Sequence, residues 1–233
     1  MTYGAASDCD QHSDHIAWGG LVLTRGRITA VVLALIGVSL AWAPSASAGP
    51  IGLRQATNAR TIARAAGGMK AAQTALRLTD ERLSLMKQVM ASKWLSRSPI
   101  QDRAQERVVV AGALALSRRR GLADAGVRRF FEQQILAAKE VQLGWGKQWL
   151  WYGFPAHTTP PDLAQLRAKL SALTPKLVDA LAGLRQLRCQ PGVRADLKRA
   201  SRRLIRTRFV SNTRRAGIVS ALLSVRHVGS TCR

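Results

Sequence analysis

The spacing of apolar residues constrains the fold of this 233-residue chain more than any other feature. Between residues 124 and 152, Phe131, Ile135, Trp145 and Trp149 recur at helical intervals. No segment of any length alternates between apolar and polar residues, as a half-buried strand would. Aromatic residues make up only 5% of the chain, while Ala, Leu and Arg dominate, which also favours helices. The sequence therefore predicts an all-α fold.

Proline, glycine and capping residues divide this pattern into five predicted helices. Ser98-Pro99 ends the first, because the residue before a proline avoids the α region. Asp102, followed three residues later by Gln105, resembles a capping-box start for the second. The predicted helices span residues 55–97, 102–120, 124–152, 162–187 and 193–228, with a kink expected at Pro175 in the fourth.

The N-terminal segment has the features of a secretory signal peptide. Arg25 and Arg27 precede the apolar run 28–43, and the small residues around Ala48 fit a cleavage site. A membrane anchor is the alternative, but it needs roughly 20 apolar residues. We therefore expect residues 1–48 to be a polar extension plus a cleaved signal, and residues 49–233 to form a single helical domain. The mature protein would be periplasmic or secreted, with no stable membrane insertion.

Removal of residues 1–48 would leave a very basic protein with two cysteines. The mature chain has 34 basic and 10 acidic residues, a surplus that points to an anionic partner such as nucleic acid, acidic lipid or a small anion. The most basic segment, Arg194–Arg215, is interpreted as the solvated face of an amphipathic helix, with an anionic surface as the alternative. Cys189 and Cys232 remain, and a disulfide is the simplest expectation for an exported protein, with free thiols as the alternative.

Residue types that support metal or covalent chemistry are scarce in the predicted mature chain. His157 and His227 are its only histidines, and no metal-ligand spacing or nucleophile elbow is present. Gly144 and Gly146 lack the spacing of a phosphate loop and are interpreted as a close contact between helices. We expect neither a metal nor a cofactor. Cations and amides remain as the functional groups.

Three polar side chains lie where helix packing alone would not place them. Arg82 and Lys93 are eleven residues apart, which returns them to within about 20° of the same helix face, roughly 16 Å apart along the axis. Gln142 falls on the apolar stripe that includes Phe131 and Trp145, where an amide needs a partner. Taken singly, the two cations also fit an ordinary basic surface, and Gln142 a boundary position.

The order of four motifs resembles the exported, AroQ-type (gamma subclass) chorismate mutases. The motifs are Glu81-Arg82-Leu83, Ser92-Lys93-Trp94, Pro99-Ile100-Gln101-Asp102 and the segment Phe130–Gln142, which reads FFEQQILAAKEVQ. The resemblance covers about residues 76–152. It implies a chorismate mutase type II helical bundle that rearranges chorismate to prephenate without a cofactor, and members of the family suggest a homodimer with each site inside one chain.

The resemblance also implies roles for individual residues. Arg82 would hold a substrate carboxylate, Lys93 a carboxylate and the ether oxygen, and Gln142 the same oxygen from the opposite side. The remaining substrate-binding positions would be Asp102, Gln105, Glu106, Ala138 and Lys176. Three of these depart from the family pattern: Gln105 and Lys176 each replace an arginine, and Ala138 replaces the Ser or Thr of some members.

These departures leave two alternatives to an active mutase. One is a weakened or inactive relative that serves as a binding or interaction module. The other is a basic envelope or nucleic-acid-binding protein that acts through Arg194–Arg215, although export makes DNA a poor partner.

Overall fold

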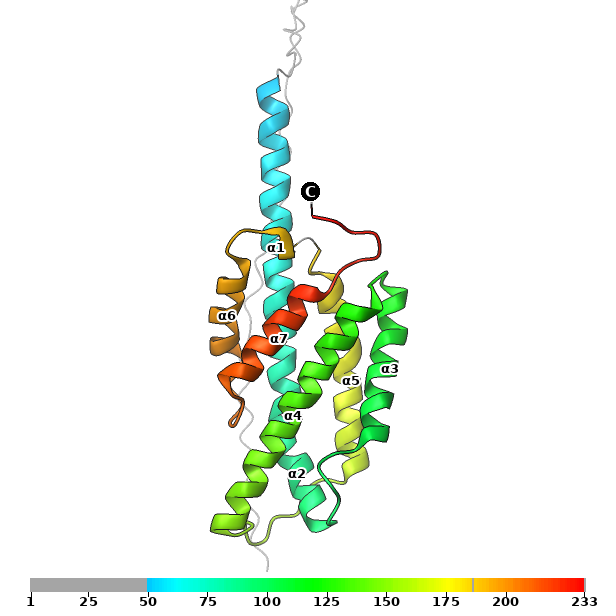
Figure 1. The fold of residues 1–233 in the computed structure, drawn as a ribbon, viewed down its shortest axis with the longest axis vertical. Coiled ribbons are helices and arrows are strands. Elements are labelled where there is room, and N and C mark those ends of the chain that lie inside the picture. Colours follow the sequence, from blue (N-terminus) through cyan, green and yellow to red (C-terminus); the bar gives the residue numbers. More distant parts are fainter. Residues whose placement is uncertain (1–49, 186, 233) are drawn as a thin grey trace, which may run out of the picture. The chain divides into compact units, whose positions relative to one another are not determined.

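The computed structural model describes residues 50–185 and 187–232, so the predicted signal peptide lies outside the described residues. Apart from one isolated bridge between Leu122 and His227, the described part is helical and contains no strand. The prediction of an all-α fold is confirmed. The helices are α1 (Pro50–Ser84), α2 (Met86–Leu95), α3 (Arg103–Arg119), α4 (Asp124–Tyr152), α5 (Leu163–Ala182), the short 3₁₀ helix η1 (Leu187–Cys189), α6 (Val193–Leu204) and α7 (Asn212–Ser224) (Figure 1).

Helix α4 packs against α2, α3 and α7, whereas α1 packs against α5 and α6. In Figure 1, α3 and α5 lie on one side of α4 and α6 lies on the other. Phe130 and Phe131 of α4 are fully buried in the core that these helices share, together with Leu76 of α1 and Leu177 of α5. Polar groups that face this core must therefore find partners inside it or line a cavity.

The bounds of α4 are the predicted residues 124–152, and Gly153 follows in a positive-φ conformation. The interpretation as a close contact between helices is confirmed for Gly146, which faces Met90 of α2, whereas Gly144 faces Phe209 in the segment between α6 and α7. A Cβ atom on Gly144 would lie 2.3 Å from the Phe209 ring, and one on Gly146 would lie 3.0 Å from the Met90 methyl group. Both glycines allow neighbouring segments to approach α4 closely.

The first predicted helix is wrong as a single element, because it is divided at Leu85 into α1 and α2. The Ser84 hydroxyl donates to the carbonyl of Glu81 over 2.7 Å. In a regular helix that carbonyl accepts from the backbone N–H of Leu85, so the serine competes with the helical bond at the point of division.

The last predicted helix is also wrong as a single element, because residues 205–211 separate α6 from α7. Asp80 of α1 accepts backbone hydrogen bonds from Arg206 at 2.9 Å and Thr207 at 2.8 Å. Ser211 then caps α7 through its hydroxyl, which accepts from the Arg214 backbone N–H. The break is stabilised by a carboxylate more than a hundred residues away in the sequence.

The predicted fourth helix is shorter than expected, since α5 ends at Ala182 rather than at residue 187. Gly183 follows it, and a Cβ there would lie 2.9 Å from the Ala71 side chain of α1. Gly183 keeps a right-handed conformation, so its missing side chain permits the close approach to α1 rather than a left-handed helix cap.

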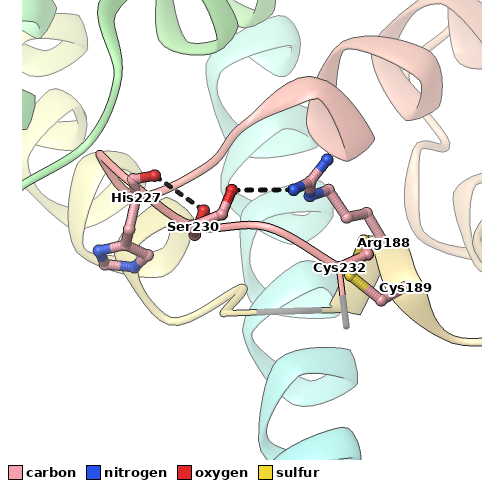
Figure 2. Close-up of a disulfide and its surroundings, with 5 residues drawn as sticks. All are labelled: Arg188, Cys189, His227, Ser230 and Cys232. Carbon is pink, nitrogen blue, oxygen red and sulfur yellow. Dashed lines mark hydrogen bonds between the residues drawn. A yellow bond between two sulfur atoms is a disulfide. The ribbon is translucent and has the colours of Figure 1, made fainter.

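A disulfide joins Cys189 of η1 to Cys232, with Cα atoms 5.5 Å apart. Figure 2 shows that the Arg188 guanidinium beside it donates to the Ser230 carbonyl, over 3.2 Å. His227 contacts the Ala182 carbonyl at 2.9 Å. The C-terminal segment is therefore attached to the bundle by both covalent and polar contacts.

The basic segment Arg194–Arg215 has an apolar face, and its cations make several contacts within the protein. Leu197 and Ile205 are fully buried. Arg214 pairs with Glu140 of α4 at 3.3 Å, and Arg215 donates to the Ile205 carbonyl at 3.1 Å. These contacts favour the interpretation of this segment as one face of the folded bundle.

Candidate functional site

A cavity of about 120 Å³ lies among helices α1 to α5. Its lining combines cations, carboxylates and amides with an apolar remainder. The charged and polar lining residues are Arg82, Lys93, Asp102, Gln105, Glu106, Gln134, Lys139, Gln142 and Arg167. The apolar ones include Leu83, Met86, Val89, Ile100, Val109, Ile135, Ala138, Leu163 and Leu170.

Arg82 enters this pocket from the last turn of α1 and is only 9% exposed. Its Nη1 donates to the Leu170 carbonyl over 2.7 Å and to the Thr174 hydroxyl over 3.3 Å, both on α5. Burial lowers the pKa of Arg82 to about 10. Neutral groups hold the guanidinium, so its positive charge is not neutralised by these contacts.

Lys93 enters from the last turn of α2 and is 6% exposed. Its ammonium donates to the carbonyls of Pro99 and Ile100, each over 2.8 Å. Burial lowers the pKa of Lys93, while the nearby Asp102 carboxylate opposes this shift. Two neutral carbonyls thus orient a second cation toward the cavity.

Asp102 links two elements that border the pocket. One carboxylate oxygen accepts from the backbone N–H of Gln105 at 3.0 Å and caps α3, as the sequence predicted. The other accepts from Nη2 of Arg167 on α5 at 2.9 Å. The Gln105 hydrogen bond lowers the pKa of Asp102, and Arg167 adds to the effect. One turn further along α3, Glu106 forms an ion pair with Lys139 of α4 at 2.7 Å.

Two buried amides on α4 line the same cavity. Gln142 Nε2 lies 3.5 Å from the Met86 sulfur and donates to the Ala138 carbonyl at 3.3 Å, while its Oε1 has no partner within the described residues. Gln134, two turns earlier, is 3% exposed. Amide groups in this state retain hydrogen-bonding capacity for a ligand.

The structure brings together most of the residues that the sequence singled out. Seven of them line the cavity: Arg82, Lys93, Asp102, Gln105, Glu106, Ala138 and Gln142. Lys176 is the exception, because it is exposed and does not line this cavity. Arg167 lines it instead. The two positions are nine residues apart, and nine steps of about 100° place them on opposite faces of α5.

A sequence signal for Arg167 was available. Leu163, Arg167 and Leu170 follow the spacing of one helix face, so a cation interrupts an apolar stripe, as the amide of Gln142 does on α4. Gln134, one turn before Ala138 on α4, is likewise a polar residue within an apolar stripe.

Comparison with known proteins identifies the family of the chain. The family model described as Chorismate mutase type II matches residues 73–143, which include Arg82, Lys93 and Gln142. A secreted chorismate mutase from Yersinia pestis is 30% identical over 145 residues, which cover 62% of this chain and 72% of the relative. One from Mycobacterium tuberculosis is 27% identical over 146 residues, covering 62% and 72%.

Solved structures show the same fold. The secreted chorismate mutase of Yersinia pestis matches with a TM-score of 0.60 and 29% identity, over 66% of this chain and 97% of that one. The chorismate mutase of Burkholderia thailandensis matches with a TM-score of 0.57 and 31% identity, over the same shares. The chain belongs to the chorismate mutase family, in its all-helical type II class.

The relatives from Yersinia and Mycobacterium are both named as secreted proteins, which agrees with the predicted export of this chain. In the part of the chain that the structure describes, no helix has the length and hydrophobicity required to span a bilayer.

Proposed function

We propose that the protein acts after export and that the cavity among α1 to α5 binds chorismate and rearranges it to prephenate. The observation that carries this proposal is the convergence of Arg82, Lys93, Arg167 and the Gln142 amide on one small cavity. Chorismate is a dianion, and breakage of its ether bond places negative charge on the ether oxygen. The pericyclic reaction needs positioning and charge stabilisation rather than proton transfer.

In this proposal the cations bind the two carboxylates and the ether oxygen of the substrate. Arg82 binds one carboxylate at one side of the cavity, and Arg167 binds the other. Lys93 contacts a carboxylate and the ether oxygen, and Gln142 donates to that oxygen through Nε2. Arg82 and Lys93 suit these roles because carbonyl and hydroxyl groups hold them, so a substrate need not displace a carboxylate from either.

The two carboxylates of the pocket have a separate role. Asp102 and Glu106 are proposed to accept from the ring hydroxyl or to orient the groups that do, since each already holds a cation of the pocket. Ala138 leaves the wall between Gln134 and Gln142 apolar. No step in the proposal requires a metal ion or an organic cofactor.

The direct test is a chorismate assay on the exported, disulfide-bonded protein, with loss of chorismate and formation of prephenate both followed. Lys93→Ala should abolish turnover and leave the far-ultraviolet circular dichroism unchanged. Lys169→Ala, which removes an exposed cation from α5, is the control and should retain full activity. A wild-type protein that leaves chorismate intact would reject the proposal.

We also propose a homodimer with one complete site in each chain, which is what the family resemblance implies. In the second half of this proposal, every group assigned a role above belongs to one chain, so no residue of a partner subunit is required. Light scattering on the exported protein tests the first half, with a mass equal to that of one chain of residues 49–233 arguing for a monomer.

A further inference from the structure

Gln134 is a buried amide in the cavity that helix packing does not satisfy. Its side chain is 3% exposed, and neither Nε2 nor Oε1 has a hydrogen-bond partner among the described residues. Buried amides in folded proteins are normally paired, because the loss of hydration is otherwise uncompensated. The catalytic roles assigned above do not use this side chain.

The position of Gln134 relates it to Arg82. Phe131 lies one turn before Gln134 on α4, and the centre of its ring is 6.0 Å from the Arg82 guanidinium carbon. Side chains three residues apart on a helix are neighbours, so Gln134 lies at the Arg82 side of the cavity. Gln142, about 12 Å further along α4, contacts Met86 instead.

We propose that Gln134 Nε2 donates to the substrate carboxylate that Arg82 holds, which makes Gln134 a substrate-binding residue. This inference rests on the proposed function. A carboxylate has about four acceptor sites, so it can accept from the guanidinium and from an amide at once. Nη1 of Arg82 already donates to Leu170 and Thr174, so fewer N–H groups of the guanidinium remain for the substrate carboxylate. The carboxylate can therefore accept from a second donor.

The charge on this carboxylate is the same in the substrate and in the transition state. A contact to it therefore contributes equally to both, and its loss should raise KM with little change in kcat. A contact from Gln142 to the ether oxygen should behave in the opposite way, because that oxygen gains charge only as the bond breaks. The two amides on α4 are thus distinguished by kinetics.

The experiment compares the same substitution at three glutamines of α4. Gln134→Met should raise KM about 10- to 150-fold, the range for a hydrogen bond to a charged group, with kcat within a few-fold of wild type. Gln142→Met should instead lower kcat. Gln148→Met is the matched control, because Gln148 has a buried, unpaired Oε1 on the same helix but does not line the cavity. Its kinetics should equal those of the wild type.

Thermal unfolding separates binding from a structural role. Because Gln134 loses no partner when it becomes Met, the midpoint of the Gln134→Met variant should be equal to or above that of the wild type. A lowered midpoint with an unchanged KM would show a structural amide and overturn the proposal. Inactive wild-type protein would reject the proposed function itself, whereas active wild type with an unaltered Gln134→Met variant would reject this inference alone.

If the Gln134→Met variant does not fold, Gln134→Glu tests whether residue 134 binds the substrate carboxylate. At neutral pH its carboxylate would repel the substrate carboxylate and raise KM. As the pH falls and this glutamate becomes protonated, it regains a donor in the same place, so KM should return toward the wild-type value. A KM that does not respond to pH in this variant would contradict the proposal.

Discussion

Nη2 of Arg167 on α5 lies 2.9 Å from the carboxylate oxygen of Asp102 that is not engaged in capping α3. One carboxylate thus fixes the start of a helix and orients a cation that follows 65 residues later. The Arg167 side chain is 40% exposed and the Asp102 side chain is 33% exposed. Because solvent screens such a pair, it adds little to the free energy of unfolding. Its effect is to hold the Arg167 guanidinium at the cavity.

The cation that α5 contributes to the site is expected to be Arg167 and not Lys176. Arg167→Gln should lower kcat/KM by about 10- to 150-fold, because it removes one charge-assisted hydrogen bond to the substrate. Lys176→Gln removes an exposed cation from the opposite face of the same helix and should have no effect. The reverse result in steady-state assays would return the role to Lys176.

The rate should fall at alkaline pH because Lys93 must carry its proton to stabilise the ether oxygen. Burial lowers the pKa of Lys93 below its ordinary value of 10.5. The value of kcat/KM, which reports the free enzyme, should therefore fall as the pH rises, with the midpoint of the fall below pH 10.5. The decline in kcat should lie at higher pH, since a bound dianion favours the protonated form. Arg82, with its pKa near 10, contributes to the same range.

A variant of Asp102 assigns this alkaline limb. The Asp102 carboxylate raises the pKa of Lys93, so Asp102→Asn should move the decline in kcat/KM to lower pH. Asparagine still caps helices well, which preserves the start of α3. A pH profile that is the same in this variant and in the wild type would show that Lys93 does not set the limb.

Gln105→Arg should increase activity. Gln105 lines the cavity where the family resemblance places an arginine, and a guanidinium there would add one charge-assisted hydrogen bond, a gain of about 10- to 150-fold in kcat/KM. Gln101→Arg adds the same charge at an exposed position outside the cavity and should leave kcat/KM unchanged. Activity that arises only in the Gln105→Arg variant would identify the natural protein as an inactive relative.

Loss of the disulfide should affect stability rather than chemistry. The bond between Cys189 and Cys232 closes a segment of 43 residues, and the chain-entropy model assigns such a loop about 4 kcal/mol. Cys189→Ser should therefore lower the free energy of unfolding by up to that amount. Neither cysteine lines the cavity, so kcat below the unfolding transition should be unchanged. Reductant should destabilise the wild type and leave the variant unaffected.

Gly144→Ala should destabilise the protein by about 1–3 kcal/mol, the range for overpacking. Its Cβ would lie 2.3 Å from the Phe209 ring, which would have to move. Gly112→Ala on α3 is the matched control, because no atom other than those of its chain neighbours and of the adjacent backbone of α3 lies within 4 Å of its added Cβ. Since alanine favours a helix interior by about 1 kcal/mol over glycine, this control should be stabilised. Chemical denaturation measures both, and equal effects would contradict the packing argument.

The features that the sequence by itself determined are those that depend on neighbouring residues. The bounds of α4 and the cap at Asp102 follow from local backbone and side-chain chemistry, whereas α2 ends at Leu95, before the stop predicted at Ser98-Pro99. The sequence also predicted that Arg82 and Lys93 share one helix face, but they lie on two separate helices, α1 and α2, and the packing of these helices brings both to the cavity.

Contacts between distant segments decided the rest. The break between α6 and α7 depends on the Asp80 carboxylate of α1, and no residue near 206 reveals that partner. The choice of Arg167 over Lys176 depends on which face of α5 turns toward α1 and α3, and this rotation is set by the burial of leucines such as Leu166 and Leu177. Periodicity predicts that a helix has a buried face, but only the packed bundle determines which polar groups meet across it.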